Sequence, residues 1–170
     1  MEEILQQIDG ALAARLFYVA LYTAITIPDI AGSLESDDGF ASQAKYAAWF
    51  DRYMGPEYGR CLSGDDCYYF RCRLIHQGTA QLSGQRPSIQ RIFFVEPRDG
   101  NIIHRNSFDI RGSKALLLDV SIFCKDMVEQ ARAWLPVARS GYNFARNDAK
   151  SIRRHPSGLH PYVIGLPVIA

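Results

Sequence analysis

The apolar residues near the start of the chain recur in steps of three and four. The residues that carry this pattern are Leu5, Ile8, Leu12, Leu16, Val19, Thr23 and Ile27. Such spacing places side chains on one face of an α-helix, and a helix with one apolar face has to bury it against other elements. Proline lacks a backbone N–H and restricts the residue before it, so Pro28 ends or kinks this helix, and Gly32 and Ser33 follow as breakers. The pattern predicts a helix over residues 2–27.

Further helices are predicted in the rest of the chain, over residues 41–54, 65–78, 113–135 and 141–152. The helix over residues 65–78 has clear boundaries, because Ser63 is a preferred N-cap residue and Gly78 is a natural stop. The helix over residues 41–54 has an aromatic face that we expect to lie in the core, and Gly55 and Pro56 end it. Pro136 closes the helix over residues 113–135.

The segment between these helices predicts a small amount of β-structure. Two apolar runs, residues 92–95 and 102–104, flank a turn at Asp99 and Gly100, which indicates a short β-hairpin after a polar connector over residues 81–87. In the tail, residues 162–164 are apolar and are expected to dock on the core. The predicted fold is mainly α, a helical bundle of four main helices with a short inserted β-hairpin, in a single domain over residues 1–170.

Composition excludes several classes of protein. Hydrophobic residues make up 48% of the 170 residues and charged residues 22%, which is typical of a globular domain rather than a disordered chain. A net charge of +1 gives no global signal for nucleic acid or an anionic membrane. The chain opens without a basic, secretory-type segment, so we expect the cytoplasm and free thiols at the cysteines. Residues 11–27 are apolar, but Arg15 and several hydroxyl groups favour a core helix, with no membrane partner.

One short segment carries most of the chemical signal. Between Phe70 and Gly78, Arg71 precedes His76 by five positions. This spacing resembles the signature of the HEPN superfamily, in which four to six residues separate an arginine from a histidine. Members of that superfamily are compact all-helical domains, many of them metal-independent ribonucleases in toxin–antitoxin and antiviral systems. The resemblance covers Arg71 to His76 and the helical layout, and Cys72 stands where the family commonly has Asn, Asp or His.

The resemblance implies a chemistry and an assembly. A histidine titrates near neutral pH, so His76 would exchange a proton with the RNA, and Arg71 would hold the phosphate and stabilise its transition state. No metal or cofactor is needed. Family members often pair so that two such sites line a shared cleft, which implies a homodimer here, with RNA as substrate and an antitoxin as a further partner. Tyr69 and Arg73 would lie near His76 and bind substrate, or else belong to a solvated face.

Helix geometry leaves a second interpretation of Arg71 open. At about 100° per residue, Arg71 and His76 lie roughly 140° apart around a straight helix. Arg71 falls among the apolar residues of that helix, so it would be a buried arginine paired with a carboxylate, Asp29 first and Glu35 second. His76 would then be a partly exposed histidine favoured by the helix dipole. On this interpretation the protein is a non-catalytic helical interaction module with Arg71 as a structural ion-pair residue.

Other candidate sites are weaker. Four residues could be imagined as zinc ligands, namely Cys61, Cys67, Cys72 and His76. No pair of cysteines has the spacing of a zinc site, so no metal is predicted and buried thiols are expected. The basic run over residues 151–155 favours a solvated face over a nucleic-acid footprint. His104 and His160 have no partner that the sequence identifies.

Overall fold

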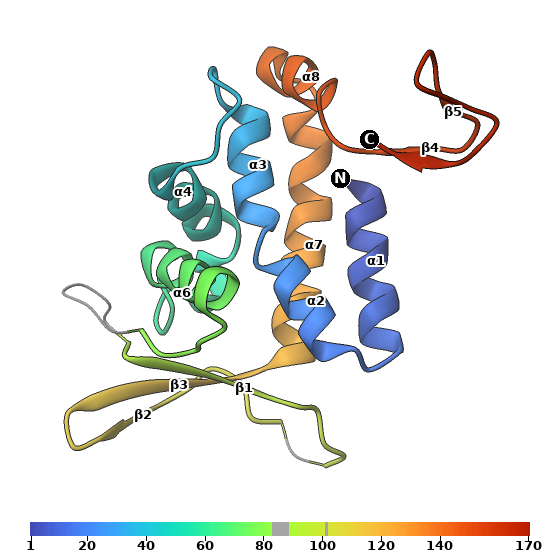
Figure 1. Ribbon diagram of the computed structural model, residues 1–170. Coiled ribbons are helices and arrows are strands. Elements are labelled where there is room, and N and C mark those ends of the chain that lie inside the picture. The colour runs from blue at the N-terminus through green and yellow to red at the C-terminus, as the bar shows by residue number, and fades with distance from the viewer. Residues whose placement is uncertain (83–88, 101) are drawn as a thin grey trace.

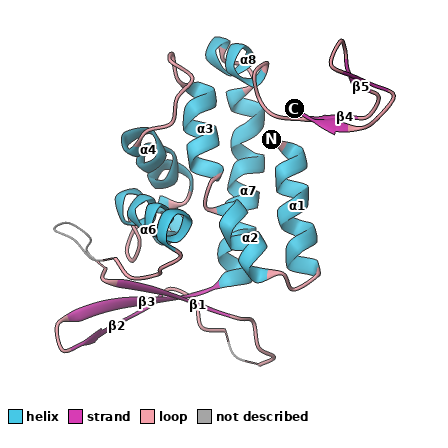
Figure 2. Ribbon diagram, in the orientation of Figure 1, coloured by secondary structure: helices cyan, strands magenta, loops and turns pink. Residues whose placement is uncertain are grey.

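The computed structural model describes residues 1–82, 89–100 and 102–170. Of the residues that the structure describes, about 52% are helical and about 17% lie in strands or β-bridges. The helices pack around a central helix, α7 (Val120–Ala138), and a small sheet lies across one end of them (Figures 1 and 2). The prediction of a four-helix bundle with an inserted hairpin is therefore wrong, because the fold mixes α and β elements although it is mainly helical. Residues 83–87 of the predicted connector lie outside the described residues.

The predicted first helix is three shorter helices. They are α1 (Glu2–Ala13), α2 (Phe17–Ala24) and α3 (Ile27–Glu35). The first break is at Arg15, whose φ of 57° is left-handed and cannot continue a right-handed helix. Pro28 begins a helix instead of ending one, because it lies in the first turn of α3, where a missing N–H leaves no bond unmade. The chain thus folds back on itself where one long helix was expected.

The helix α6 (Gly64–Gln77) matches its prediction within one residue at each end. The Ser63 hydroxyl accepts the backbone N–H of Asp66 at 3.1 Å, and Gly78 adopts the left-handed φ of 62° that ends a helix. The helix packs against α4 (Gln43–Tyr53), whose aromatic face lies in the core as predicted. Between them, α5 (Gly55–Tyr58) is a single turn that begins at the Gly–Pro pair expected to end the helix before it.

The sheet contains three strands in the order β1, β3, β2. The strand β1 (Arg91–Val95) runs parallel to β3 (Ser113–Asp119), and β2 (Asn106–Ile110) runs antiparallel to it. The predicted hairpin is wrong, because residues 102–104 form no strand and β1 pairs with β3. The hairpin that does form joins β2 to β3 through Arg111 and Gly112, whose φ values of 55° and 80° suit a two-residue turn.

The strand β3 continues directly into α7, although residues 113–135 were predicted to be one helix. Asp119 is the last residue of the strand and the N-cap of the helix, and its carboxylate accepts the backbone N–H of Ile122 at 2.9 Å. A short apolar run such as the one from Leu116 to Leu118 has no period that separates strand from helix. Pro136 lies inside α7 and does not close it.

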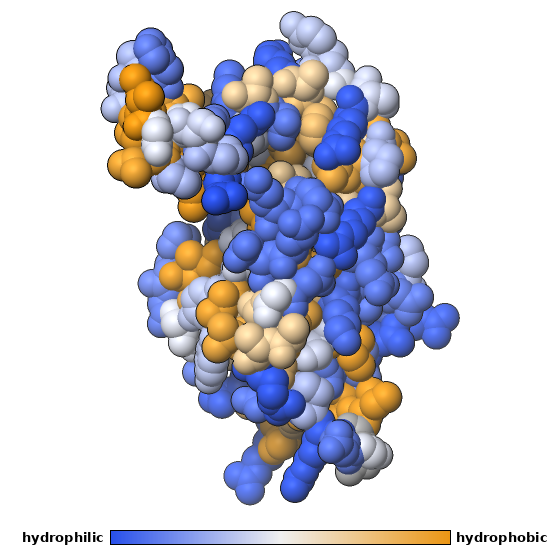
Figure 3. All heavy atoms as spheres, turned by 90° about the vertical axis from the view of Figure 1, so that its right-hand side faces the viewer, coloured by the Kyte–Doolittle hydropathy of each residue, from blue (hydrophilic) through white to orange (hydrophobic). Residues whose placement is uncertain are grey.

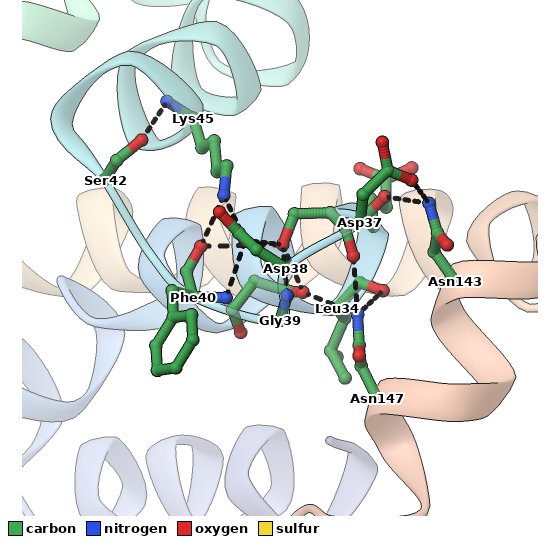
Figure 4. A network of polar contacts seen from close by, with 12 residues as sticks. Leu34, Asp37, Asp38, Gly39, Phe40, Ser42, Lys45, Asn143 and Asn147 are labelled. Carbon is green, nitrogen blue, oxygen red and sulfur yellow. Dashed lines mark hydrogen bonds and ion pairs between the residues drawn. The ribbon is translucent and has the colours of Figure 1, made fainter.

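The short helix α8 (Tyr142–Asp148) caps the end of α3 (Figure 4). The side-chain amide of Asn147 donates to three backbone carbonyls there, those of Ser33, Leu34 and Ser36, at 2.8–3.2 Å. The last carbonyls of a helix have no partner within the helix itself. Because Asn147 is 8% exposed, its contacts satisfy these groups where water cannot reach them.

The last twenty residues, 151–170, form a projecting C-terminal arm (Figure 1). It contains two small antiparallel ladders, β4 (Arg154–His155) with β7 (Val168–Ile169) and β5 (Gly158–Leu159) with β6 (Val163–Ile164). The expected docking of residues 162–164 on the core is wrong, since Tyr162 is 83% exposed. Figure 3 shows apolar side chains on the surface of this arm.

One stretch, Phe17–Glu35, is long and apolar enough to cross a membrane by length and composition alone. In the fold, 61% of that window is buried, and the stretch comprises α2 and α3. Its buried side chains join the same core as Trp134 and Phe123 of α7. The stretch therefore has the packing of core helices.

Candidate functional site

The helix α6 places Arg71 against the first turn of α3. The Arg71 Nε atom lies 2.6 Å from Asp29 Oδ2, and the two side chains are 22% and 11% exposed. The Nε–H bond is not aligned on that oxygen as in a hydrogen bond, so the contact is an ion pair. Asp29 was the preferred partner from the sequence, whereas Glu35, the second choice, lies at the other end of α3.

Burial dominates the electrostatics of this pair. It raises the pKa of the Asp29 carboxyl above its ordinary value, and the Arg71 cation only partly opposes this. Burial also lowers the pKa of Arg71, but the Asp29 carboxylate and the neighbouring Cys72 thiol more than offset it, so the pKa of Arg71 is raised. The guanidinium therefore keeps its charge in this half-buried position.

The far end of the Arg71 side chain turns toward the side of α6 that carries His76. Its Nη1 atom lies 3.8 Å from the Cys72 sulfur as a donor. Cys72 is four residues before His76, so the two lie only about 40° apart around the helix. The other terminal nitrogen of Arg71 forms no hydrogen bond to the described parts of the chain. An arginine held at Nε by Asp29 thus keeps donors for an anion on its outer edge.

The remaining predicted residues of α6 are Tyr69 and Arg73, which are half-buried, and His76. His76 is exposed in the last turn of the helix. The Tyr69 hydroxyl receives a hydrogen bond from the side-chain amide of Gln43 at 3.4 Å, and Arg73 donates to the side-chain carbonyl of Gln77 at 2.7 Å. Tyr69 and Arg73 precede His76 by seven and three residues, so both share its side of the helix. The first is held by a contact to α4 and the second by a contact within α6.

A second polar cluster, which the sequence did not identify, lies around His104. The backbone N–H of Asp119 donates to His104 Nδ1 at 3.2 Å, so Nδ1 carries no proton and the ring proton is on Nε2. The Nε2–H group then donates to the Tyr58 hydroxyl at 2.9 Å, and this hydroxyl donates to Asp126 Oδ2 at 2.5 Å. The result is a directed chain of hydrogen bonds from the start of α7 to its second turn.

Burial also sets the ionisation of this cluster. It lowers the pKa of His104, whose side chain is 7% exposed, and the Asp126 carboxylate only partly opposes this. Burial and the hydrogen bond to Asp126 raise the pKa of Tyr58 far above its usual value. His104 and Tyr58 are 46 residues apart in the chain, and no local spacing pattern relates such distant residues.

Of two cavities in the fold, one borders α6 and the other lies at the end of α3 that is remote from Asp29. A groove of about 330 Å³ runs between α2, the end of α6 and β1, and it is lined by Tyr18, Tyr22, Leu74, Gly78, Phe93 and Glu96, among others. The Tyr22 hydroxyl donates to the backbone carbonyl of Leu74 at 3.3 Å, which ties α2 to α6 along this groove. A second cavity of about 410 Å³ lies between α3, α4 and α8 and is lined by charged residues of both signs.

The cysteines imagined as zinc ligands are free thiols, and Cys67 is buried. Over residues 1–82, 89–100 and 102–170, no three His, Cys, Asp or Glu side chains gather as a metal-binding group. Comparison of the chain with protein-family models, with curated proteins and with solved structures finds no match.

Proposed function

We propose that the protein is an HEPN-like, metal-independent endoribonuclease that acts as a homodimer, with Arg71 and His76 at its site. The observation that carries the proposal is the position of the Arg71 guanidinium. Asp29 holds its inner edge at 2.6 Å, while its Nη1 atom lies against Cys72, on the side of α6 that bears His76. An ion pair of this kind orients a cation for an incoming phosphate. The RNA substrate and the free thiols both accord with a cytoplasmic protein in a toxin or defence role.

The residue types suit cleavage of RNA through its own 2′-hydroxyl. His76 takes the 2′-hydroxyl proton as the 2′-oxygen attacks phosphorus, and the bond from phosphorus to the 5′-oxygen breaks. The leaving 5′-oxygen receives a proton from the imidazole of a second protomer, so the products are a 2′,3′-cyclic phosphate and a 5′-hydroxyl. Arg71 donates to the phosphoryl oxygens and stabilises the added negative charge. The second protomer makes the dimer part of the proposal.

The test is RNA cleavage in the presence of EDTA by the wild type and by two conservative variants. Arg71→Lys keeps a cation near Asp29 but loses the planar fork that binds phosphate, and His76→Gln keeps polarity but cannot exchange a proton. We expect each variant to lose at least about tenfold in cleavage rate while remaining folded. His160→Gln, in the exposed arm, is the matched control and should cleave at the wild-type rate. Equal rates in all four proteins would reject the site.

The second candidate function is a non-catalytic interaction module. It is favoured by the closed ion pair inside one chain and by the exposed apolar residues of the C-terminal arm, with Ile164 72% and Ile169 73% exposed. If this function is correct, the wild type cleaves no RNA, so Arg71→Lys and His76→Gln have no cleavage to alter. Removal of residues 151–170 then abolishes self-association of the protein. Sedimentation of the full chain and of the shortened chain separates the two functions, since an HEPN-like dimer organised around α6 persists without the arm.

A further inference from the structure

The exposed side of α2 carries a stripe of apolar residues, which is formed by Leu16, Tyr18, Val19 and Tyr22. Tyr18 is 80% exposed, and Leu16 and Val19 are each more than half exposed. Because the four residues are spaced by three and four positions, they lie side by side on the helix surface. The α2 stripe borders the groove between α2, α6 and β1, which Tyr18 and Tyr22 line. A contiguous apolar patch on the surface of a folded domain marks an interaction site.

The C-terminal arm carries a second exposed apolar surface. Tyr162 is 83% exposed, and Ile164 and Leu166 follow it at steps of two residues and are each more than half exposed. Residues 151–170 contain no Asp or Glu, and the two small ladders hold this segment in shape. The arm therefore presents apolar side chains that the described part of the same chain leaves in solvent.

The two surfaces lie at opposite ends of α1 (Figure 1). The base of the arm borders the first half of this helix, where Gln6 and Gln7 line a cavity together with Ile169. The α2 stripe begins three residues after Ala13, the last residue of the helix. The 12 residues of α1 separate the two surfaces by about 18 Å along its axis. A second copy turned by 180° about an axis across the middle of α1 therefore brings its α2 stripe to the arm of the first copy, and its arm to the stripe of the first.

The surface of α1 between the arm and the stripe suits such a contact. Its exposed residues from Gln6 to Ala14 are uncharged. Asp9, the charged residue in that stretch, is half-buried and pairs with Arg132 of the same chain at 2.8 Å. Interfaces between protein chains are depleted of charged residues at their centre and enriched in tyrosine. This stretch of α1 therefore has no unpaired charge that would lose its water in a dimer.

The area of the two surfaces is sufficient for a reversible dimer. An aromatic side chain buries about 150–250 Å² when it is covered. Two-fold symmetry uses Tyr18 and Tyr162 twice each, so the four rings alone supply on the order of 600 Å². The aliphatic residues of both surfaces and the two α1 helices add to this, toward the roughly 1,200–2,000 Å² of a stable interface. Because each chain keeps its own core, the single chain remains the folded unit.

We propose that the C-terminal arm binds the α2 stripe of a second copy of this chain, and that the two copies exchange these contacts around a two-fold axis across α1. The arm residues Tyr162, Ile164 and Leu166 lie against the stripe, and the groove beside Tyr18 receives one of the aliphatic side chains. The inference develops the second candidate function, because it names the surface that the arm binds. It does not depend on RNA cleavage, since neither Arg71 nor His76 takes part.

Sedimentation equilibrium of full-length variants tests the contact. Val19→Glu places a charge in the stripe and Ile164→Glu places one on the arm, and both residues are exposed, so each variant should fold. Each should lose at least about tenfold in dimer affinity, because the dimer would bury a charge without a partner. Ile110→Glu, at an exposed apolar residue of β2, is the matched control and should associate as the wild type does. Association that the control loses, or that the two variants keep, would overturn the proposal.

Mixing the two variants distinguishes an arm that binds the stripe from arms that bind each other. The Ile164→Glu chain keeps an intact stripe and the Val19→Glu chain keeps an intact arm, so their mixture regains one of the two contacts. We expect a heterodimer that is weaker than the wild-type dimer but tighter than the association of either variant alone. The double variant leaves no intact pair with either single variant and should form no heterodimer. A mixture that associates no better than its separate components would reject the contact between arm and stripe.

The same variants separate this proposal from the nuclease and from another occupant of the arm. If a dimer organised around α6 also forms, Val19→Glu and Ile164→Glu lose the step from that dimer to a larger assembly. RNA cleavage without arm-dependent association supports the nuclease alone, and arm-dependent association without cleavage supports the arm contact alone. A wild type that stays monomeric and cosediments through its arm with vesicles of phosphatidylcholine and phosphatidylserine would assign the arm to a lipid surface and refute the contact.

Discussion

Asp29 and Arg71 form the contact on which the candidate site depends. The carboxylate is 11% exposed, so it would remain in an apolar setting if the cation were removed. Its alternatives are to bind a proton or to draw in water, and both cost stability. The pairing could be expected from the sequence because Arg71 falls on the apolar side of its helix and Asp29 follows the first apolar stretch. The position of the guanidinium tip could not, because side-chain torsions are not a property of the spacing.

Removal of this cation should destabilise the protein. We expect Arg71→Ala to lower the free energy of unfolding by about 2 kcal/mol, less than the roughly 3–5 kcal/mol for a fully buried pair, because Arg71 keeps 22% exposure. Urea unfolding of Arg71→Ala, Asp29→Asn and the double variant measures the coupling, and the double variant should lose less than the sum. Arg132→Ala, which breaks exposed surface pairs with both Glu2 and Asp9, should cost under about 1 kcal/mol. Strict additivity would show that the pair contributes nothing.

The His104 cluster makes a prediction about pH. Burial lowers the pKa of His104 in the folded protein, so protonation favours the unfolded state, and the stabilisation is present above about pH 6.5 and is lost as pH falls through the folded pKa. The charged groups that face the ring are Asp126, Asp119 and Arg105. Urea unfolding at pH 5 to 8 should show that the wild type loses its advantage over His104→Gln as the pH falls. Parallel profiles for the two proteins would contradict this role.

At the scale of elements, the helices with strong local signals were predictable and the sheet was not. The boundaries of α6 follow from Ser63 and Gly78, which act within one turn of the helix. The strand β3 is defined by pairing with β1, so that Leu116 lies opposite Ile92 across 24 residues of chain. No periodicity reports such pairing, and a short run of leucines fits a buried strand and a buried helix equally well.

Alanine should have opposite effects on stability at two helical glycines, Gly64 at the contact of α6 with α4 and Gly10 in α1. A Cβ at Gly64 would lie 2.5 Å from the backbone oxygen of Ala47 and 2.6 Å from its Cα, so Gly64→Ala should cost about 1–3 kcal/mol by overpacking. Gly10 lies inside α1 with nothing within 4 Å of its Cβ position, so Gly10→Ala should gain about 0.5–1 kcal/mol through helix propensity. Thermal unfolding of both variants checks the pair of signs, and a stabilised Gly64→Ala would show that the two helices lie farther apart.

At the scale of the whole molecule, the core and the C-terminal arm are energetically distinct. The core contains the large side chains of α4, α6 and α7, whereas the arm leaves most of its apolar residues in solvent. Its contact with α1 includes the hydrogen bond from the backbone N–H of Arg154 to the Glu3 carboxylate at 3.4 Å. The sequence suggested docking because apolar residues generally seek burial. The two small ladders of the arm instead pair its own backbone groups.

Removal of the arm should therefore be tolerated. A chain that ends at Lys150 should keep its melting temperature within about 3 °C of the full chain, because few buried contacts are lost. A chain that ends at Ser140 also loses α8 and the amide of Asn147 that caps α3, and it should melt at least about 5 °C lower. Circular dichroism melting curves measure both. A large loss on removal of the arm alone would make it part of the folded core.

The junction at Asp119 has a consequence for how any ligand enters the groove. Since one residue both ends β3 and begins α7, the sheet has no hinge there, and β1 is hydrogen-bonded along its length to that same strand. The strand β1 forms one wall of the groove, and it cannot move outward unless α7 moves with it. Binding of a ligand in the groove should therefore require little change in the protein's structure. The association rate should then be limited by how often ligand and protein meet, because the groove is already open.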